Sequence, residues 1–383
     1  MITEATLYLA TPEDARGALL SVVGQPVAFH ALVAAIRAGC HRVSVPAGFR
    51  GTEVERAIAA SPRARAATVW LDAEAPPPRG RSLLLPAAAL VPAADLRRML
   101  QGDATTSVLV PDASAPVVAA PADLTRALWP EIRAERPLAP SLRRMLENHA
   151  SGRAADWYVH VTSPRRAREA EMLLYGTLGS PIDTPLDTAF HRRLSRSLTR
   201  MAITLGLTPN HVSLLSLLVG LLAVWGFWRA TPASAGLGLA LYALASVLDH
   251  TDGEVARLTL AESRLGEWLD VATDTVIHAL LVLAMGVTAQ QAAGRGAVAL
   301  GVLAAIGVVV SAMIAKTSPR SAGGGFGGFL EALGSRDGFY AMLIAFILAL
   351  AAAPGLLPLL MIVVAAGSHA YWLGRLAYRL FAR

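Results

Sequence analysis

The sequence of 383 residues contains almost no lysine and almost no cysteine. Lys316 is the single lysine and Cys40 is the single cysteine, so arginine supplies nearly all of the basic side chains. One cysteine excludes an intramolecular disulfide and a thiolate cluster for zinc. Cys40 stands in an Ala-Gly-Cys-His-Arg segment between a predicted helix and a predicted strand, where we expect a packed thiol and not a nucleophile.

A secretory signal is also missing, because no basic segment followed by an apolar stretch opens the sequence. We therefore expect the N-terminal part to stay in the cytoplasm. The net charge is +6, and a basic balance can indicate nucleic-acid binding. The arginines gather instead beside long apolar runs, at 192–200 and 375–383, which favours anionic membrane lipid as the partner and no nucleic acid.

Strand-like and helix-like segments alternate over residues 1–135. The expected strands are 6–10, 42–46, 67–71 and 82–86, and the expected helices are 27–38, 53–60 and 94–100. This alternation predicts a soluble α/β domain with a parallel sheet. Residues 136–186 are more polar and are predicted to form a helical connector.

Long apolar runs dominate the sequence from about His211 onward, as expected for helices that cross a hydrocarbon layer of about 30 Å. Six spans are predicted, at 211–229, 235–258, 265–289, 297–316, 339–353 and 355–373. A cytoplasmic N-terminus leaves only Arg229 and Arg295 in the outside loops, as the positive-inside rule requires. The sequence thus predicts a multi-domain protein with an all-α, six-helix transmembrane domain over 187–383.

Residues 187–205 precede the first span and are predicted to form an amphipathic helix. Phe190, Leu194 and Met201 lie on one side of it and arginines lie on the other. An ordinary surface helix packed on the N-terminal domain would show the same pattern. The position directly before a membrane span favours a helix in the membrane interface.

Four aspartates lie where the second predicted span ends and the third begins. Asp249 and Asp252 are three positions apart, and Asp270 and Asp274 are four apart, so each pair lies on one face of its helix. A short turn between the helices allows the two pairs to face each other. Carboxylates in such a place repel one another unless a cation neutralises them, and hard oxygen ligands suit Mg²⁺ or Mn²⁺.

Two other interpretations of these aspartates remain: a structural polar network between two helices, and the ion pathway of a cation-coupled transporter. The regular spacing argues against a purely structural network. The carboxylates are also predicted at the cytoplasmic ends of spans, beside Gly253 and Arg257, which favours an enzyme over a transporter.

The segment from Asp249 to Asp274 reads D-x2-D-G-x2-A-R-x8-G-x3-D-x3-D. It resembles the signature of the CDP-alcohol phosphotransferase family, with every fixed position present. The resemblance covers about residues 187–383, and the segment 207–213 resembles the family's entry to its first span. It implies an integral membrane enzyme of a bacterium or archaeon, a homodimer, that transfers a substituted phosphate group from a CDP-alcohol and releases CMP.

The resemblance also implies a role for each matching residue. Asp249, Asp252 and Asp270, with Asp274 near them, would hold two metal ions, Mg²⁺ or Mn²⁺, at the pyrophosphate of the donor. Asp274 would act as the general base that takes the proton of the acceptor hydroxyl. The residues implied at the nucleotide are Asp252, Gly253, Ala256, Arg257, Gly266, Thr208, Pro209 and Asn210.

The N-terminal part carries a second, partial resemblance. Gly24 to His30, the following helix and the strand at 42–46 resemble part of a sugar-nucleotide cytidylyltransferase domain, which is fused to some members of the family. The glycine-rich nucleotide loop is missing near residues 8–20, and Ala87 and Ala88 stand where a metal-binding aspartate is usual. We therefore expect a degenerate nucleotidyltransferase-like domain that serves docking or regulation.

The acceptor is predicted from three basic residues, Lys316, Arg336 and Arg375, at the cytoplasmic ends of later spans. Phosphatidylinositol-phosphate synthases of the family hold an acceptor phosphate with basic groups of this region. Positive-inside anchoring explains the same residues equally well. The predicted donor is CDP-diacylglycerol and the predicted acceptor is a polyol or polyol phosphate such as inositol phosphate. A soluble CDP-polyol donor, as in di-myo-inositol-phosphate-phosphate synthesis, is the alternative.

Overall fold

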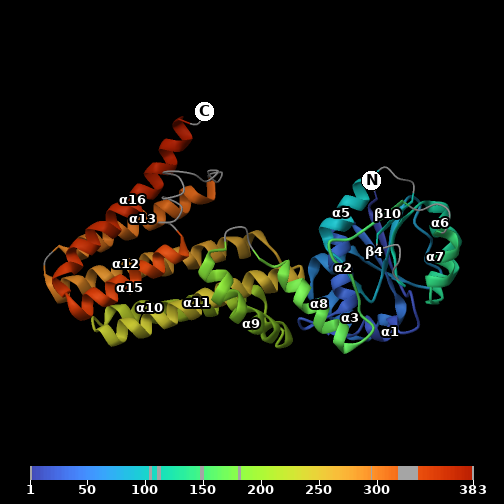
Figure 1. The fold of residues 1–383 in the computed structure, drawn as a ribbon, viewed down its shortest axis with the longest axis horizontal. Coiled ribbons are helices and arrows are strands. Elements are labelled where there is room, and N and C mark those ends of the chain that lie inside the picture. The colour runs from blue at the N-terminus through green and yellow to red at the C-terminus, as the bar shows by residue number, and fades with distance from the viewer. Residues whose placement is uncertain are drawn as a thin grey trace. The chain divides into compact units, whose positions relative to one another are not determined.

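The computed structural model describes residues 2–102, 106–109, 114–146, 151–179, 183–294, 296–317 and 335–381. The chain divides into two compact units, each with its own core. Unit 1 comprises Met1–Leu178, Arg200–Gly206 and Glu254–Ala261. Unit 2 comprises Gly179–Thr199, Leu207–Gly253 and Glu262–Arg383. The described strands all belong to unit 1, whereas the regular structure of the described part of unit 2 is helical (Figure 1).

A seven-stranded sheet with the order β10-β8-β9-β6-β1-β4-β5 forms the centre of unit 1. Its strands are β1 (Glu4–Tyr8), β4 (Arg42–Pro46), β5 (Thr68–Leu71), β6 (Ser82–Pro86), β8 (Ser107–Leu109), β9 (Val117–Ala120) and β10 (Ser151–Arg153). β5, β4, β1 and β6 run parallel, as the sequence predicts. β9, a strand that the sequence analysis does not predict, is antiparallel to both of its neighbours, so the complete sheet is mixed. Only residues 110–116 separate β8 from β9, which is too short for the crossover that parallel neighbours need.

Short helices surround this sheet. They are α1 (Asp14–Gly17), α2 (Val27–Ala38), η1 (Ala47–Phe49), α3 (Glu53–Ala60), α4 (Pro62–Ala67), α5 (Ala93–Gln101), α6 (Ala122–Arg133), α7 (Ala139–Leu146) and α8 (Pro164–Gly176). Two strand pairs complete the unit: β2 (Ser21–Val22) with β3 (Gln25–Pro26), and β7 (Ala89–Leu90) with β11 (Val159–His160). The bounds predicted for 27–38, 42–46, 53–60 and 82–86 agree with α2, β4, α3 and β6.

The core of unit 1 lies between α2 and the parallel strands. Leu7, Leu32, Val43 and Leu85 are completely buried there, and each such side chain contributes roughly 1.5–3 kcal/mol to folding. Cys40 is buried in the same core, and this burial raises the pKa of its thiol to about 12. The expectation of a packed, unreactive thiol is therefore confirmed.

Of the residues that the sequence predicts as a connector, 136–178 belong to unit 1 and 179–186 belong to unit 2. The segment supplies α7, β10, β11 and α8, and its Leu142 and Val161 are completely buried. The segment is polar in composition, and buried apolar side chains such as these pack its elements into unit 1.

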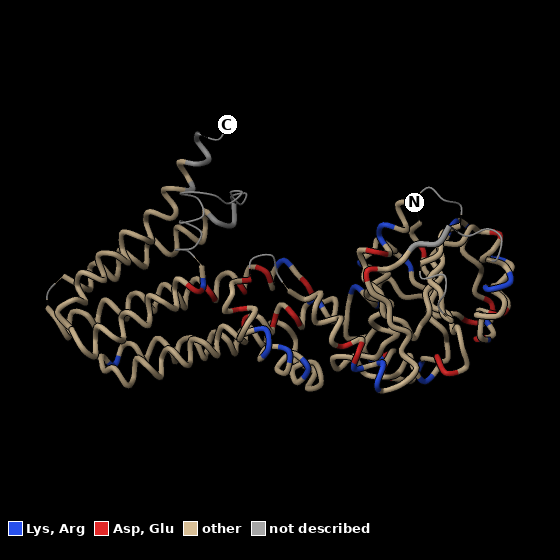
Figure 2. The backbone as a smooth tube through the Cα atoms, in the orientation of Figure 1, with Lys and Arg blue, Asp and Glu red and all other residues tan. Residues whose placement is uncertain are grey.

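Long apolar helices make up most of unit 2. Its elements are η2 (Asp187–His191), α9 (Arg192–Thr204, whose last turn lies in unit 1), α10 (Pro209–Trp228), α11 (Pro232–Thr259, whose end lies in unit 1), α12 (Arg264–Ala293), α13 (Ala297–Thr317), α15 (Arg336–Ala352), η3 (Pro354–Leu356) and α16 (Leu357–Phe381). Charged residues are scattered over unit 1, whereas in the long helices of unit 2 they gather near the aspartates and are sparse over the remaining length (Figure 2).

Five helices of the described chain are long and apolar enough to cross a membrane: Pro209–Trp228, Pro232–Thr259, Arg264–Ala293, Ala297–Ile314 and Pro354–Gly374. The span predicted at 339–353 corresponds to α15, an apolar helix of 17 residues. Large apolar side chains such as Leu214, Leu218 and Trp225 remain exposed on α10, as expected for a surface that contacts lipid. The chain is an integral membrane protein.

Two glycines allow α12 and α13 to pack closely. A Cβ atom added at Gly286 would lie 2.7 Å from the Gly301 Cα and 2.8 Å from the Ala297 carbonyl oxygen. Both neighbours are backbone atoms, so a larger residue forces the helices apart. We expect Gly286→Val to cost about 1–3 kcal/mol of stability, measured as a lower Tm in detergent. The matched control is Gly236→Val in α11, where a Cβ meets no atom within 4 Å; an equal loss there would contradict the prediction.

Candidate active site

Three of the four predicted aspartates come together between α11 and α12. One carboxylate oxygen from each of Asp249, Asp252 and Asp270 lies within 4.8 Å of the other two. Asp252 is buried and accepts a hydrogen bond from the Ser213 hydroxyl of α10. Carboxylates so close together repel unless a cation lies among them, and an all-oxygen donor set is the one that Mg²⁺ and Mn²⁺ prefer. The residues therefore fit a divalent metal ion.

Asp274 lies one helical turn beyond Asp270 and outside this group of three. Its carboxylate oxygens lie 3.9 Å from Arg336 Nη2 and 3.9 Å from His278 Nδ1, and its side chain is 43% exposed. The His278 ring is fixed by the Asp274 carbonyl at 2.6 Å and by the Tyr242 hydroxyl at 2.9 Å. Asp274 is thus a partly exposed carboxylate with two basic side chains beside it.

Arg336, which the sequence predicts at the acceptor, begins α15 and reaches the carboxylates. Its Nη2 donates to Asp249 Oδ2 at 2.7 Å, and its Nη1 lies 3.3 Å from Asp187 Oδ1. The side chain is 16% exposed, so its charge acts where water screens it weakly. The side chains of Lys316 and Arg375, the other two predicted acceptor residues, lie outside the described residues.

The N-termini of α10 and α12 approach each other at the predicted nucleotide residues. The Thr208 hydroxyl accepts a hydrogen bond from the His211 amide and starts α10, with Pro209 as its first residue. A Cβ atom on Gly266 would lie 3.5 Å from the Asn210 side-chain oxygen, so the two helix starts are in contact distance here. The Ser263 hydroxyl accepts from the Gly266 amide at 3.0 Å and caps α12.

The remaining nucleotide residues lie along α11. Gly253 directly follows Asp252 in unit 2, whereas Ala256 and Arg257 belong to the end of the helix that lies in unit 1. Within unit 1, Arg257 Nη2 donates to the Leu178 carbonyl at 3.1 Å.

The structure adds functional candidates that sequence reasoning missed. Asp187 Oδ1 lies 2.8 Å from His191 Nδ1 and 2.8 Å from His250 Nε2, and His191 Nε2 lies 3.0 Å from the Tyr340 hydroxyl. Burial alone would raise the pKa of Asp187, but the hydrogen bonds from the two histidines hold it well below its ordinary value. His250 stands inside the aspartate motif, and this position was the available signal.

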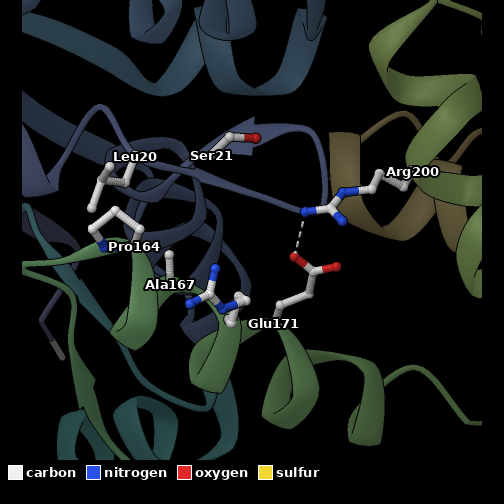
Figure 3. A pocket seen from close by; sticks show the side chains of 7 residues that line it. Leu20, Ser21, Pro164, Ala167, Glu171 and Arg200 are labelled. Atoms are coloured by element: carbon white, nitrogen blue, oxygen red, sulfur yellow. Dashed lines mark hydrogen bonds and ion pairs between the residues drawn. The ribbon is translucent and has the colours of Figure 1, made fainter.

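A cavity of about 310 Å³ lies within unit 1 (Figure 3). Its lining residues are Leu20, Ser21, Pro164, Ala167, Arg168, Glu171 and Arg200. Arg200 Nη2 donates to Glu171 Oε2 at 2.8 Å, so these two opposite charges neutralise each other. None of the predicted site residues lines this cavity.

Comparison with known proteins shows what the membrane part is similar to. Residues 206–372 match the family model described as CDP-alcohol phosphatidyltransferase. A CDP-diacylglycerol–serine O-phosphatidyltransferase from Mycobacterium leprae (strain TN) is 39% identical over 78 residues, 20% of this chain and 25% of the relative. A bifunctional IPC transferase and DIPP synthase from Rubrobacter xylanophilus is 36% identical over 144 residues, 37% of this chain and 32% of the relative. An archaetidylinositol phosphate synthase from Pyrococcus horikoshii is 35% identical over 79 residues, 21% of this chain and 40% of the relative.

Apolar helices that bring clustered carboxylates together define an integral membrane protein with an acidic, metal-compatible site. Over residues 206–372, the chain is similar to the CDP-alcohol phosphatidyltransferase family. The matched stretches span about a quarter to two fifths of the length of these curated relatives.

Proposed function

We propose that the chain is a metal-dependent phosphotransferase that moves a phosphatidyl group from CDP-diacylglycerol to a polyol or polyol phosphate such as inositol phosphate, and releases CMP. The observation that carries this proposal is the meeting of Asp249, Asp252 and Asp270 within 4.8 Å, with Asp274 accessible beside Arg336. The family match and the names of the relatives support a hydroxyl-bearing acceptor.

The chemistry divides between the carboxylates. Asp249, Asp252 and Asp270 would hold Mg²⁺ or Mn²⁺, which when bound neutralises the pyrophosphate of the donor. Asp274 takes the proton from the acceptor hydroxyl, and the hydroxyl oxygen then attacks the β-phosphorus. The bond between this phosphorus and the bridging oxygen breaks, and CMP leaves with the electron pair.

The proposed nucleotide residues of unit 2 are Asp252, Gly253, Gly266 and the segment from Thr208 to Asn210. Their support is the proximity of Gly266 to the Asn210 side chain at the N-termini of α10 and α12, because the positive end of a helix dipole suits a nucleotide phosphate. Ala256 and Arg257 receive the same role from the family motif alone.

At the acceptor side, Arg336 would bind the phosphate of a polyol phosphate next to the base. Its distance of 3.9 Å from Asp274 supports this role. Lys316 and Arg375 are assigned to the same pocket from their sequence positions. A homodimer, with the active site and N-terminus on the cytoplasmic side, is part of the proposal.

For the N-terminal domain we propose a degenerate nucleotidyltransferase-like fold without catalysis. Asp14 is completely buried and accepts from the Ala10 amide at 2.8 Å, from the Thr11 hydroxyl at 2.7 Å and from His160 at 2.7 Å. The Ala10 amide and the Thr11 hydroxyl, which follow β1, thus already donate hydrogen bonds to the Asp14 carboxylate. These donors are therefore not available to a nucleotide phosphate. This supports a docking or regulatory role.

The proposal is tested by CMP release from cytidine-labelled CDP-diacylglycerol with purified protein. The acceptor panel is inositol phosphate, inositol, serine and glycerol. We expect release that depends on an acceptor and on Mg²⁺ or Mn²⁺, and that stops when EDTA removes the cation. A soluble CDP-polyol as the only working donor would favour the alternative reaction, to which the Rubrobacter relative's name points. Cation uptake by proteoliposomes without any CMP release would favour a transporter.

A further inference from the structure

A hydrogen-bonded cluster lies next to the carboxylates, built from residues that the aspartate motif does not require. We propose that Asp187 is a positioning residue, which together with His191 and His250 holds the Arg336 guanidinium where it meets the acceptor. This inference rests on the proposed function, because it gives Arg336 an orientation that acceptor binding needs.

Asp187 is 3% exposed. The described partners of its carboxylate are two histidine rings, a guanidinium and a backbone amide. Its Oδ1 faces His191 Nδ1 and His250 Nε2, each at 2.8 Å, and Arg336 Nη1 at 3.3 Å. Its Oδ2 accepts from the Thr184 amide at 2.9 Å. The carboxylate is therefore fixed from several sides and cannot turn away from the guanidinium without losing these bonds.

Arg336 is held between two carboxylates from different elements. Nη1 faces Asp187 of η2, while Nη2 donates to Asp249 of α11. His250 Nε2 lies 2.7 Å from Arg336 Nη1 and 2.8 Å from Asp187 Oδ1. With a hydrogen on Nε2 the ring donates to Asp187, and without one it accepts from Arg336, so in either tautomer it holds one of these two side chains. Two anchored nitrogens fix the plane of a guanidinium, and a planar fork is what bidentate binding of a phosphate requires.

Another use of the cluster is as a metal site, because Asp187, His191 and His250 offer ligand atoms within 4.8 Å of one another. Their donors and acceptors are already paired with each other, and a permanent cation, Arg336, lies 3.3 Å from the carboxylate. A second cation there would meet strong repulsion in weakly screened surroundings.

A purely structural role is the other reading. Buried charges stabilise a fold no better than apolar side chains of similar volume, since their desolvation offsets the attraction. The cluster also touches the metal-compatible group directly, through Arg336 and Asp249. The position of the cluster is explained if it orients the Arg336 guanidinium beside the carboxylates that take part in the reaction.

The test is a double-mutant cycle with Asp187→Asn and Arg336→Ala. We expect Asp187→Asn to raise the KM for inositol phosphate about tenfold and to leave the KM for CDP-diacylglycerol within twofold. In the Arg336→Ala background the same change should have almost no further effect, because its target is gone. The dissociation constant of inositol phosphate, measured by calorimetry without donor, should follow the same pattern.

Asp183→Asn is the matched control. Asp183 forms a comparably buried ion pair with Arg192, at 2.9 Å, in the segment that also holds Asp187. We expect this control to leave the KM for inositol phosphate unchanged. If Asp187→Asn does not fold, His191→Gln replaces it, because His191 bonds Asp187 directly; a smaller rise in the same KM is then expected.

The inference is overturned if Asp187→Asn and Arg336→Ala have additive effects on the KM for inositol phosphate. It is also overturned if Asp187→Asn changes the KM values for inositol phosphate and CDP-diacylglycerol equally. Neither result affects the proposed function as long as the wild type transfers the phosphatidyl group. Absence of CMP release from the wild type overturns the proposed function. In that case inositol phosphate binding decides the inference: coupled losses in the two variants support it, and independent losses or no binding refute it.

Discussion

Replacing Asp274 by Asn is expected to lower kcat about 10²–10⁴-fold and to leave the fold and cation binding in place. The amide keeps the shape of the side chain but cannot take a proton from the acceptor hydroxyl. Asp274 lies outside the three carboxylates that meet within 4.8 Å, so the metal site should keep its principal ligands. The KM for CDP-diacylglycerol should therefore change little.

Asp249→Asn provides the contrast, because Asp249 is one of the three carboxylates and also the partner of Arg336. We expect this variant to lose Mn²⁺ affinity, measured by calorimetry or by electron paramagnetic resonance, whereas Asp274→Asn retains it. Asp123→Asn, at an exposed position of α6, controls for the loss of one carboxylate. Near-normal CMP release by Asp274→Asn would show that another group is the base.

The meeting of Asp249, Asp252 and Asp270 is predictable from sequence because it depends on local geometry. Helical periodicity places the first two on one face, and a short turn returns the chain with the third. Long-range contacts have no such signal. Arg336 reaches Asp249 across 87 positions and Asp187 across 149, so the sequence predicts a basic residue at the acceptor without its two carboxylate partners.

The juxtamembrane segment shows the same limit. Its alternating apolar and basic residues predict an amphipathic helix, and α9 forms with Leu194 and Met201 exposed. Asp187 and His191 carry no distinguishing pattern, since an acidic and a basic residue four positions apart are common on helices. Only tertiary packing against His250 and Tyr340 shows that they belong to the site.

In unit 1, the predicted strands and helices recur because each has a clear apolar pattern and boundary residues. The antiparallel direction of β9 follows from the short loop that precedes it. Residues 136–178 pack into unit 1 through a few buried side chains such as Leu142. The missing nucleotide loop was visible in the sequence. The hydrogen bonds of the Asp14 carboxylate were not visible in the sequence, because one of its partners, His160, is 146 positions away.

Arg336→Ala is expected to raise the KM for a phosphate-bearing acceptor about tenfold to a hundredfold. A charge-assisted contact contributes roughly 1.5–3 kcal/mol, and a dianion at the edge of the membrane needs a balancing cation to offset its lost hydration. Measured at saturating Mg²⁺, the KM for CDP-diacylglycerol should stay nearly constant. Arg336→Lys keeps the charge but loses the planar fork, so we expect an intermediate KM.

Arg229→Ala is the control for this series, because it removes an exposed arginine at the C-terminal end of α10, where its guanidinium stacks on Trp225. Initial rates with inositol phosphate and with uncharged inositol separate the contributions. A contact with the phosphate predicts a large loss with the first acceptor and a small loss with the second. If Arg336→Ala binds inositol phosphate as tightly as the wild type does, no phosphate meets this guanidinium. The side chain would then serve only to balance Asp249, and an uncharged polyol such as glycerol or inositol would be the better acceptor.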